Sequence, residues 1–148
     1  KDNYVFTEKK TKDVMLMKPT TGMNNSGLAL KHFVKLFNIN LNNLYVCVDD
    51  VDLPLGRIRI RPKGGDGCHR GLESIIYHLG STSFPRLRIG VASSDYKRPS
   101  ENYVLKPFKN KDHNFSKEMV QIAADAAESL FYNGLDKTMN QYNKLEMG

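Results

Sequence analysis

Apolar positions along the chain follow two periods, the alternation typical of strands and the repeat of about 3.6 residues typical of helices. Alternation or a short apolar run predicts strands at residues 4–7, 14–18, 44–48, 56–61 and 85–91. The helical period predicts helices at residues 25–37, 72–79 and 116–134, and a shorter one from Asp136. For residues 93–114, which follow neither period, we predict an irregular surface loop. Strands that alternate with helices favour a single α/β domain, with a mixed twisted sheet flanked by helices.

Three aspartates, Asp49, Asp50 and Asp52, directly follow the apolar run 44–48, which reads as a buried parallel strand. Ligand-binding groups gather at the carboxyl ends of strands in open α/β sheets. The carboxylates can bind Mg²⁺, polarise a catalytic histidine or cap the next turn. Their spacing does not decide among these, although a hard-cation site usually needs further oxygen ligands.

A glycine-rich loop, KGGDGCHRG at Lys63–Gly71, joins a predicted strand to a predicted helix. Such a loop offers free backbone N–H groups and the positive end of a helix dipole to an anion such as phosphate, or it is simply a tight connection. Within it, His69 can act as a general base, contact a substrate or have a structural role. A catalytic dyad with Cys68 is disfavoured, because side chains of adjacent residues rarely meet.

Two segments alternate basic and apolar residues, 56–61 and 85–91, and we expect them to be neighbouring strands. Their cations form either the solvated face of a sheet or a patch that follows phosphates, and we favour the second reading. The chain has a net charge of +6 and a pI near 9.3, which also favours a polyanionic partner. The candidate residues for this nucleic-acid contact are Arg57, Arg59, Arg61, Lys63, Arg86 and Arg88.

The composition is that of an ordinary globular domain, with 40% hydrophobic and 26% charged residues among 148. No window approaches the roughly eighteen apolar residues of a membrane helix, so we expect no membrane partner. Two cysteines, Cys47 and Cys68, fit free thiols in a reducing compartment. The chain does not begin with Met, which we interpret as processing or truncation. Bacterial cytoplasm, mitochondrion and plastid all fit, and processing favours an organelle.

Four ordered motifs resemble those of bacterial-type peptidyl-tRNA hydrolases. Lys18–Gly27 is similar to the family's KPxTxMNxSG, Val48–Gly56 to HDDLDLPxG, Gly65–Leu72 to GxGGHNGL and Phe84–Gly90 to FxRLRIGI. The resemblance covers nearly the whole chain. It implies one α/β domain that cleaves the ester between a nascent peptide and the tRNA 3′ end, with tRNA or another structured RNA as partner. It also implies that no metal or cofactor is needed.

The resemblance assigns roles to individual residues of this chain. Asn24 would hydrogen-bond the peptide near the scissile ester, and Asp49 would orient and polarise the catalytic histidine. His69 and its loop would contact the tRNA 3′ end or gate the cleft. Met23, Gly67 and Arg70 would join it in substrate binding, and the basic strands would hold the phosphates of the acceptor arm.

The chain also departs from the family pattern. Nothing in it matches the GLGNPGxxYxxTRHNxG segment that carries the general-base histidine, so we expect an N-terminally incomplete domain. Arg70 replaces the usual asparagine after the loop histidine, and Gly22 replaces an aromatic residue before Met-Asn. Loss of an internal strand would leave open sheet edges and a poorly stable chain that needs the missing segment, or a partner protein or ribosome, to cover them.

Two accounts follow from these departures. In one, the chain is a hydrolase whose N-terminal segment is absent or supplied separately. In the other, it is an inactive homologue, a structural RNA-binding component of a ribosome or another RNA assembly. We discount a third, a nucleotide-binding site at the glycine loop, because no acidic residue lies at the spacing such sites require.

Overall fold

The computed structural model describes residues 3–9 and 14–147, and its elements form two compact units. The first unit comprises Lys1–Leu44 and Gly64–Ser83, and the second comprises Tyr45–Lys63 and Phe84–Gly148. The predicted fold class, α/β with a mixed sheet and flanking helices, is confirmed. The extent of the domain stays a prediction.

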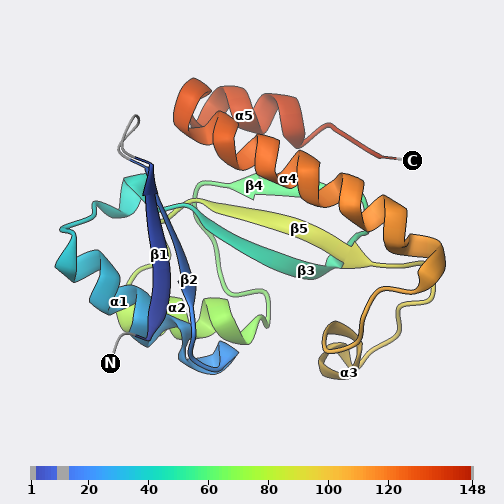
Figure 1. Ribbon diagram of the computed structural model, residues 1–148, viewed down its shortest axis with the longest axis horizontal. Coiled ribbons are helices and arrows are strands. Elements are labelled where there is room, and N and C mark those ends of the chain that lie inside the picture. The colour runs from blue at the N-terminus through green and yellow to red at the C-terminus, as the bar shows by residue number, and fades with distance from the viewer. Residues whose placement is uncertain (1–2, 10–13, 148) are drawn as a thin grey trace. The chain divides into compact units, whose positions relative to one another are not determined.

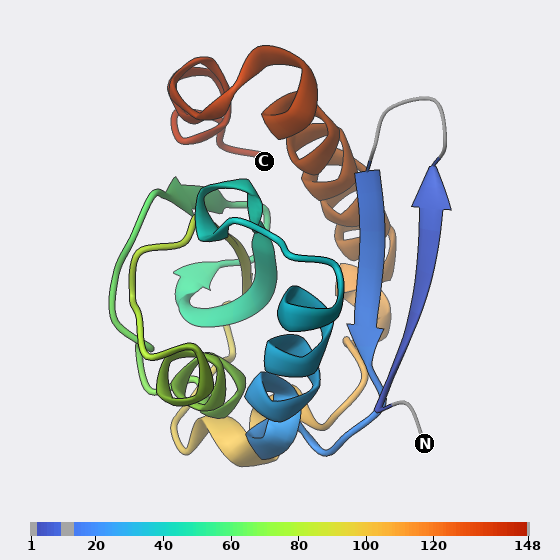
Figure 2. The ribbon, with the colours of Figure 1, turned by 90° about the vertical axis from the view of Figure 1, so that its left-hand side faces the viewer.

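The first unit packs a β-hairpin against helices. The two predicted strands are present: β1 (Tyr4–Lys9) and β2 (Val14–Pro19) pair antiparallel, and their connection at residues 10–13 lies outside the described part of the chain. A 3-10 turn, Met23–Asn25, leads into α1 (Ser26–Leu36). Helix α2 (Arg70–Leu79) lies beside α1 (Figures 1 and 2). The buried members of this core are Tyr4, Ala29 and Phe33.

The second unit is a three-stranded sheet with two helices on one face (Figure 1). Its strands are β3 (Val46–Pro54), β4 (Ile58–Arg61) and β5 (Arg86–Ala92), in the order β3-β5-β4. Strand β5 pairs parallel with β3 and antiparallel with β4, so the two basic segments are neighbours, as predicted. Helices α4 (His113–Asn133) and α5 (Leu135–Tyr142) bury the apolar side of the sheet, at Ile58, Ile60, Leu87, Ala123, Ala126 and Leu130.

The outer edge of β4 is covered by the chain's own C-terminal segment. The Asn143 side chain accepts a hydrogen bond from the Ile60 N–H (2.7 Å) and donates one to the Ile60 carbonyl (3.0 Å). Further along, Arg57 and Glu146 form an isolated antiparallel bridge, and the Met147 N–H donates to the Gly56 carbonyl at 3.3 Å. Asn143 thus satisfies the backbone groups that an edge strand leaves open.

Three expectations about individual elements are wrong. Strand β3 does not end at residue 48 but continues through the aspartates to Pro54, with a register shift between Asp50 and Pro54. The stretch 93–114 contains a short helix, α3 (Ser100–Val104), and a 3-10 turn (Asn110–Asp112). Helix α4 begins at His113 rather than at residue 116, and the Ser116 hydroxyl donates to the His113 carbonyl within the first turn, at 2.8 Å.

Candidate functional site

The turn that carries Asn24 is closed by local hydrogen bonds. The Asn25 N–H donates to the Gly22 carbonyl at 2.9 Å, and the Ser26 hydroxyl donates to the Met23 carbonyl at 2.8 Å. Asn24 is exposed, and its side-chain amide has no hydrogen-bond partner among the residues that the structure describes. A fixed backbone therefore presents an amide that can donate to or accept from a ligand.

The loop before α2 is built around Asp66. Its side chain accepts the Cys68 N–H at 2.8 Å, and its carbonyl accepts the His69 N–H at 3.0 Å. Gly67 and Cys68 have φ angles of 58° and 62°, in the left-handed region. Glycine adopts this region freely, whereas a cysteine there is uncommon. The turn delivers His69 to the first position before α2.

His69 caps α2 through its imidazole. Its Nδ1 accepts the Leu72 N–H at 3.2 Å, so Nδ1 carries no proton while this bond is present. In the neutral ring Nε2 then carries the hydrogen, so that nitrogen is a hydrogen-bond donor rather than a proton acceptor. This geometry suits the predicted substrate contact better than the role of a substitute general base.

The cap also limits the predicted phosphate cradle. The Leu72 N–H is bound by the imidazole, and the Glu73 N–H donates to the His69 carbonyl at 2.9 Å. Those two donors of the first helical turn are satisfied within the chain. An anion at this helix end would have only the remaining first-turn donors and the side chain of Arg70, which is exposed.

Gly71 brings the Met23 turn and the His69 loop together. A Cβ at Gly71 would lie 2.7 Å from the Met23 Sδ and 2.9 Å from the His69 Cε1, so both side chains lie against the bare backbone at this position. No larger residue fits there unless one of these side chains moves. Within the first unit, the structure therefore brings Met23 and His69 together at the beginning of α2, and Asn24 follows Met23 in the same turn.

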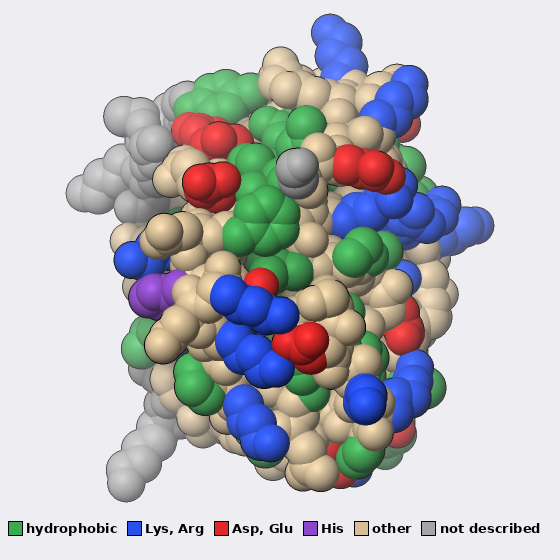
Figure 3. All heavy atoms as spheres, turned by 90° about the vertical axis from the view of Figure 1, so that its right-hand side faces the viewer, with side chains coloured by type: hydrophobic (Ala, Val, Ile, Leu, Met, Phe, Trp, Pro, Cys, Tyr) green, Lys and Arg blue, Asp and Glu red, His purple; other side chains and the backbone are tan. Residues whose placement is uncertain are grey.

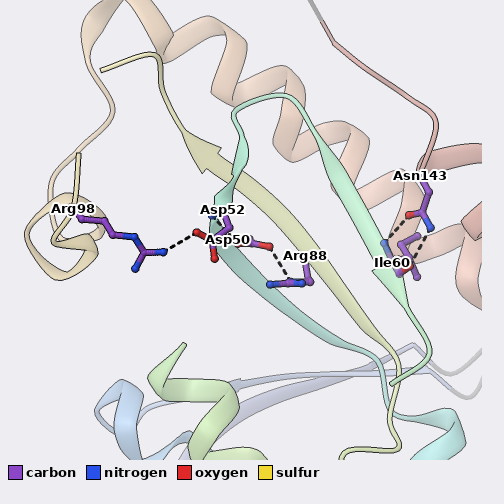
Figure 4. Close-up of polar contacts among 6 residues, drawn as sticks. All are labelled: Asp50, Asp52, Ile60, Arg88, Arg98 and Asn143. Atoms are coloured by element: carbon purple, nitrogen blue, oxygen red, sulfur yellow. Dashed lines mark hydrogen bonds and ion pairs between the residues drawn. The ribbon is translucent and has the colours of Figure 1, made fainter. Parts of the chain in front are cut away.

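The three aspartates have different environments in the second unit. Asp49 is half-buried and lies opposite Ile89 in the register of β5. Asp50 is buried: its Oδ1 accepts the Asp52 N–H at 2.9 Å and its Oδ2 forms an ion pair with the Arg88 Nε at 2.8 Å (Figure 4). Asp52 is exposed and pairs with Arg98 at 3.0 Å. Among the residues described, no group of three or more potential ligands could hold a metal ion.

The basic strands divide into paired, buried and exposed cations. Arg57 pairs with Glu146 at 2.6 Å, and Arg88 pairs with Asp50. Arg59, Arg61 and Lys63 have neither a hydrogen-bond nor an ion-pair partner in the described part of the chain. Arg61 and Lys63 are exposed and Arg59 is half-buried. These three side chains remain the best candidates for RNA phosphates.

Arg86, predicted to bind RNA phosphates, does not lie at the surface. It is only 2% exposed, and its guanidinium lies 4.4 Å from the centre of the Phe84 ring. Burial, with the nearby charge of Arg88, lowers the pKa of Arg86. The physical reason is the central position of β5 between β3 and β4, which the alternation of residues does not reveal.

A second basic cluster lies in the connection between β5 and α4. Lys109 and Lys111 both bind the Asp95 carboxylate, at 2.7 and 2.9 Å. These two lysines lower the pKa of Asp95 to about 2. On the side of the molecule where α3 lies in Figure 1, basic and acidic side chains are accordingly interspersed (Figure 3). This region therefore presents less free positive charge than its lysine content suggests.

One buried residue beside the site was not predicted to matter. Ser74 lies on the buried side of α2 and binds the backbone of α1, with the Gly27 N–H 3.0 Å from its hydroxyl. The only sequence signal is a small polar residue among the apolar positions Leu72, Ile75 and Ile76. That signal does not identify its partner, which lies 47 residues away in the sequence.

Comparison with known proteins gives a consistent picture. The family model described as "Peptidyl-tRNA hydrolase" matches residues 1–148. A peptidyl-tRNA hydrolase of Clostridium tetani is 43% identical over 142 residues, which is 96% of this chain and 72% of that protein. One from a Hydrogenobaculum species is 42% identical over 134 residues, 90% of this chain and 71% of that protein.

Solved structures agree with these sequence matches. The crystal structure of peptidyl-tRNA hydrolase from Acinetobacter baumannii aligns with a TM-score of 0.86 at 27% identity, covering 97% of this chain and 74% of that one. A peptidyl-tRNA hydrolase crystallised in complex with N-propanol aligns with a TM-score of 0.87 over 99% of this chain and 75% of that one. No helix in the described part of this chain is long and apolar enough to cross a membrane. The chain belongs to the peptidyl-tRNA hydrolase family.

Proposed function

We propose that this chain binds the acceptor end of tRNA and acts in hydrolysis of the ester that joins a peptide to the tRNA 3′ end. One observation carries the proposal. The turn that carries the unpartnered Asn24 amide meets the His69 imidazole at Gly71, through Met23, within a chain whose relatives are named peptidyl-tRNA hydrolases. Two adjacent groups of this kind suit the amides and the ester of a peptidyl-adenosine end.

The chemistry requires a proton acceptor. A water oxygen attacks the ester carbonyl carbon while a histidine accepts the water's proton, and the bond from that carbon to the 3′ oxygen then breaks. The 3′ oxygen takes up that proton, which gives tRNA and the peptide acid, and the acid releases the second proton of the water to solvent and becomes a carboxylate. Asn24 would hydrogen-bond the peptide beside the ester, and the His69 Nε2–H would bind the 3′ end. Asp49 would orient the basic histidine, which is the role of the carboxylate in a catalytic triad.

The resemblance assigns the base to the histidine of a GLGNPG-type segment and not to any of the four histidines of this chain. The His69 Nδ1 accepts the Leu72 N–H at 3.2 Å. The His32 Nδ1 lies 3.1 Å from the Tyr4 hydroxyl, and the His78 Nδ1 lies 2.8 Å from the Ser74 carbonyl. His113 is exposed at the beginning of α4. We therefore propose that hydrolysis uses the histidine of a GLGNPG-type segment supplied to this chain, and that Arg59, Arg61 and Lys63 bind the acceptor-arm phosphates.

The test is single-turnover cleavage of an N-acylated aminoacyl-tRNA by the purified chain, alone and with a family N-terminal segment added. We expect cleavage when the segment is present, and we expect Asn24→Ala and Asp49→Asn to reduce it about 100-fold or more. Asp52→Asn is the matched control, because this neighbouring carboxylate faces Arg98 at the surface and should leave the rate unchanged.

Each alternative result has a distinct meaning. Cleavage by the chain alone that is lost in His69→Ala would identify His69 as a substitute base and contradict the donor role assigned to it. Binding of tRNA without cleavage in either arm would favour an RNA-binding protein that has lost its chemistry. Absence of tRNA binding at low salt would overturn the proposal.

A further inference from the structure

Helices α1 and α2 approach one another closely at Gly27 and Ser74. A Cβ on Gly27 would lie 2.0 Å from the Ser74 carbonyl oxygen and 2.4 Å from its carbonyl carbon, so only glycine fits at this position. The Gly27 N–H donates a buried hydrogen bond to the Ser74 hydroxyl at 3.0 Å. Both residues are buried, and Ser74 is 7% exposed. The beginning of α1 is therefore anchored to α2.

This anchor takes the place of an ordinary helix cap. The first N–H groups of a helix have no partner within it and need acceptors from elsewhere. The residue at the N-cap of α1, Asn25, makes no side-chain capping bond. The Ser74 hydroxyl supplies an acceptor from the neighbouring helix instead. His78 holds Ser74 in turn, since its Nδ1 lies 2.8 Å from the Ser74 carbonyl and must donate its hydrogen to it.

The turn that presents Asn24 is continuous with this anchored helix end. Asn24 lies three residues before Gly27, in the Met23–Asn25 turn that the Ser26 hydroxyl closes onto the Met23 carbonyl. The position of the first turn of α1 therefore determines the position of the Asn24 amide. We infer that Ser74 is a positioning residue for Asn24: its hydroxyl fixes the start of α1, and through it the amide that binds substrate. This inference rests on the proposed function of Asn24.

A misplacement of a substrate-binding group by about 1 Å can cost as much as 100-fold in rate. The shift here is transmitted through one turn of backbone, so we expect Ser74→Ala to slow single-turnover cleavage about tenfold. Ser74→Cys keeps a weakly accepting atom of similar size and should give an intermediate rate. It also serves as the test variant if Ser74→Ala does not fold.

A double-mutant cycle separates positioning from stability. If Ser74 acts through Asn24, Ser74→Ala has no further effect on the rate in an Asn24→Ala background. The matched control is Ser129→Ala, which removes another buried helical hydroxyl, bonded to Thr138 at 2.8 Å in the other unit. It should lower the Tm and leave the rate of the folded protein unchanged. An equal reduction by Ser74→Ala in both backgrounds would overturn the inference.

A readout that needs no activity distinguishes failure of this inference from failure of the proposed function. In nuclear magnetic resonance spectra, Ser74→Ala should shift the Asn24 side-chain amide signals and speed hydrogen exchange at Gly27, whereas Ser129→Ala should do neither. If the wild-type protein does not cleave under any condition, the proposed function fails and these spectra alone decide. Unchanged Asn24 signals in Ser74→Ala would refute positioning, whatever the activity.

Discussion

Strands β4 and β5 have the same sequence pattern and different environments. Both alternate arginine with an apolar residue, and in the antiparallel register Arg61 lies opposite Arg86 and Arg59 opposite Arg88. Yet Arg61 is exposed while Arg86 is buried against Phe84, and Arg88 is paired with a buried carboxylate. Strand β4 is an edge strand and β5 is central. For Arg61 and Arg86, position in the sheet, which the alternation does not encode, decides whether the arginine can meet a ligand.

The comparison extends to the backbone. The edge strand has its open hydrogen-bonding groups at Ile60 satisfied by the side chain of Asn143, while the central strand is bonded on both sides by other strands. Covering the edge with a side chain instead of a further strand keeps the residues on either side, Arg59 and Arg61, beside solvent. The fold can therefore display cations on β4 without exposing an unpaired strand edge at this point.

Replacing Arg61 and Arg86, which lie opposite one another, should give the largest difference in the free energy of unfolding between the two strands. Arg86→Ala deletes a buried side chain and its contact with the Phe84 ring, and we expect a loss of about 3 kcal/mol in the free energy of unfolding. Arg61→Ala removes an exposed side chain and should change it by no more than about 0.5 kcal/mol. Urea unfolding at neutral pH measures both. Equal losses would show that the environments of the two strands do not differ as described.

The buried ion pair of Arg88 gives the next effect in size. Asp50→Ala leaves the Asp52 N–H without its acceptor and Arg88 without its carboxylate, and we expect a loss of about 2 kcal/mol. The control is Asp52→Ala, which breaks the exposed pair with Arg98 and should cost less than about 1 kcal/mol.

A double variant sharpens this result. Replacing Arg88 with Met in the Asp50→Ala background removes the unpaired charge, so part of the lost free energy should return. If Arg88→Met gives no recovery there, the guanidinium does not depend on Asp50, and Arg88 regains its place among the candidate phosphate contacts.

RNA binding tests whether the exposed cations Arg61 and Lys63, and not the buried Arg86, contact phosphates. Each phosphate contact adds about 0.9 to the slope of log affinity against log salt on a duplex. Arg61→Ala and Lys63→Ala should each reduce that slope by about this amount for an acceptor-stem duplex. Arg86→Met, which keeps most of the side-chain volume, should leave it unchanged. A reduced slope in Arg86→Met would mean that this buried cation reaches phosphate in the complex.

The sequence is sufficient to predict the elements that depend on local pattern. Helix α2, the β1–β2 hairpin and the pairing of the two basic segments follow from periodicity, and the four motifs identify the family. The extension of β3 through Asp50 was missed because charged residues usually end a buried strand. Here the Asp50 charge is compensated by Arg88, a partner 38 positions along the chain that no local pattern indicates.

The candidate site divides in the same way. The loop glycines, His69 and Asn24 could be predicted from motifs. The capping bond from the Leu72 N–H to the His69 Nδ1, which leaves the hydrogen of the neutral ring on Nε2, could not. Ser74 was also missed, because its importance lies in a contact with a glycine on another helix. A sequence shows which residue stands at a position, but what that residue can do chemically also depends on hydrogen bonds such as these, which only the folded structure shows.

The smallest expected effect is on the titration of Asp95, the carboxylate that binds the exposed side chains of Lys109 and Lys111. Lys109 and Lys111 lower its pKa to about 2, through hydrogen bonds and then through charge. Because the pKa in the folded state is below the ordinary value of about 3.9, the stabilising contribution is complete above that value and is lost as the pH falls toward about 2. A carboxyl-carbon chemical-shift titration of Asp95 measures this directly.

The lysines themselves supply the control for that titration. In a Lys109→Ala/Lys111→Ala variant the Asp95 midpoint should return to about 3.9, and high salt should move the wild-type midpoint in the same direction because the pairs are exposed. Asp95→Asn should in turn release both lysines and raise the salt dependence of RNA binding toward that of a surface with free cations. If the wild-type midpoint lies near 3.9, the lysines of this loop are as free as Arg61 and Lys63, and the basic surface of the protein extends beyond β4.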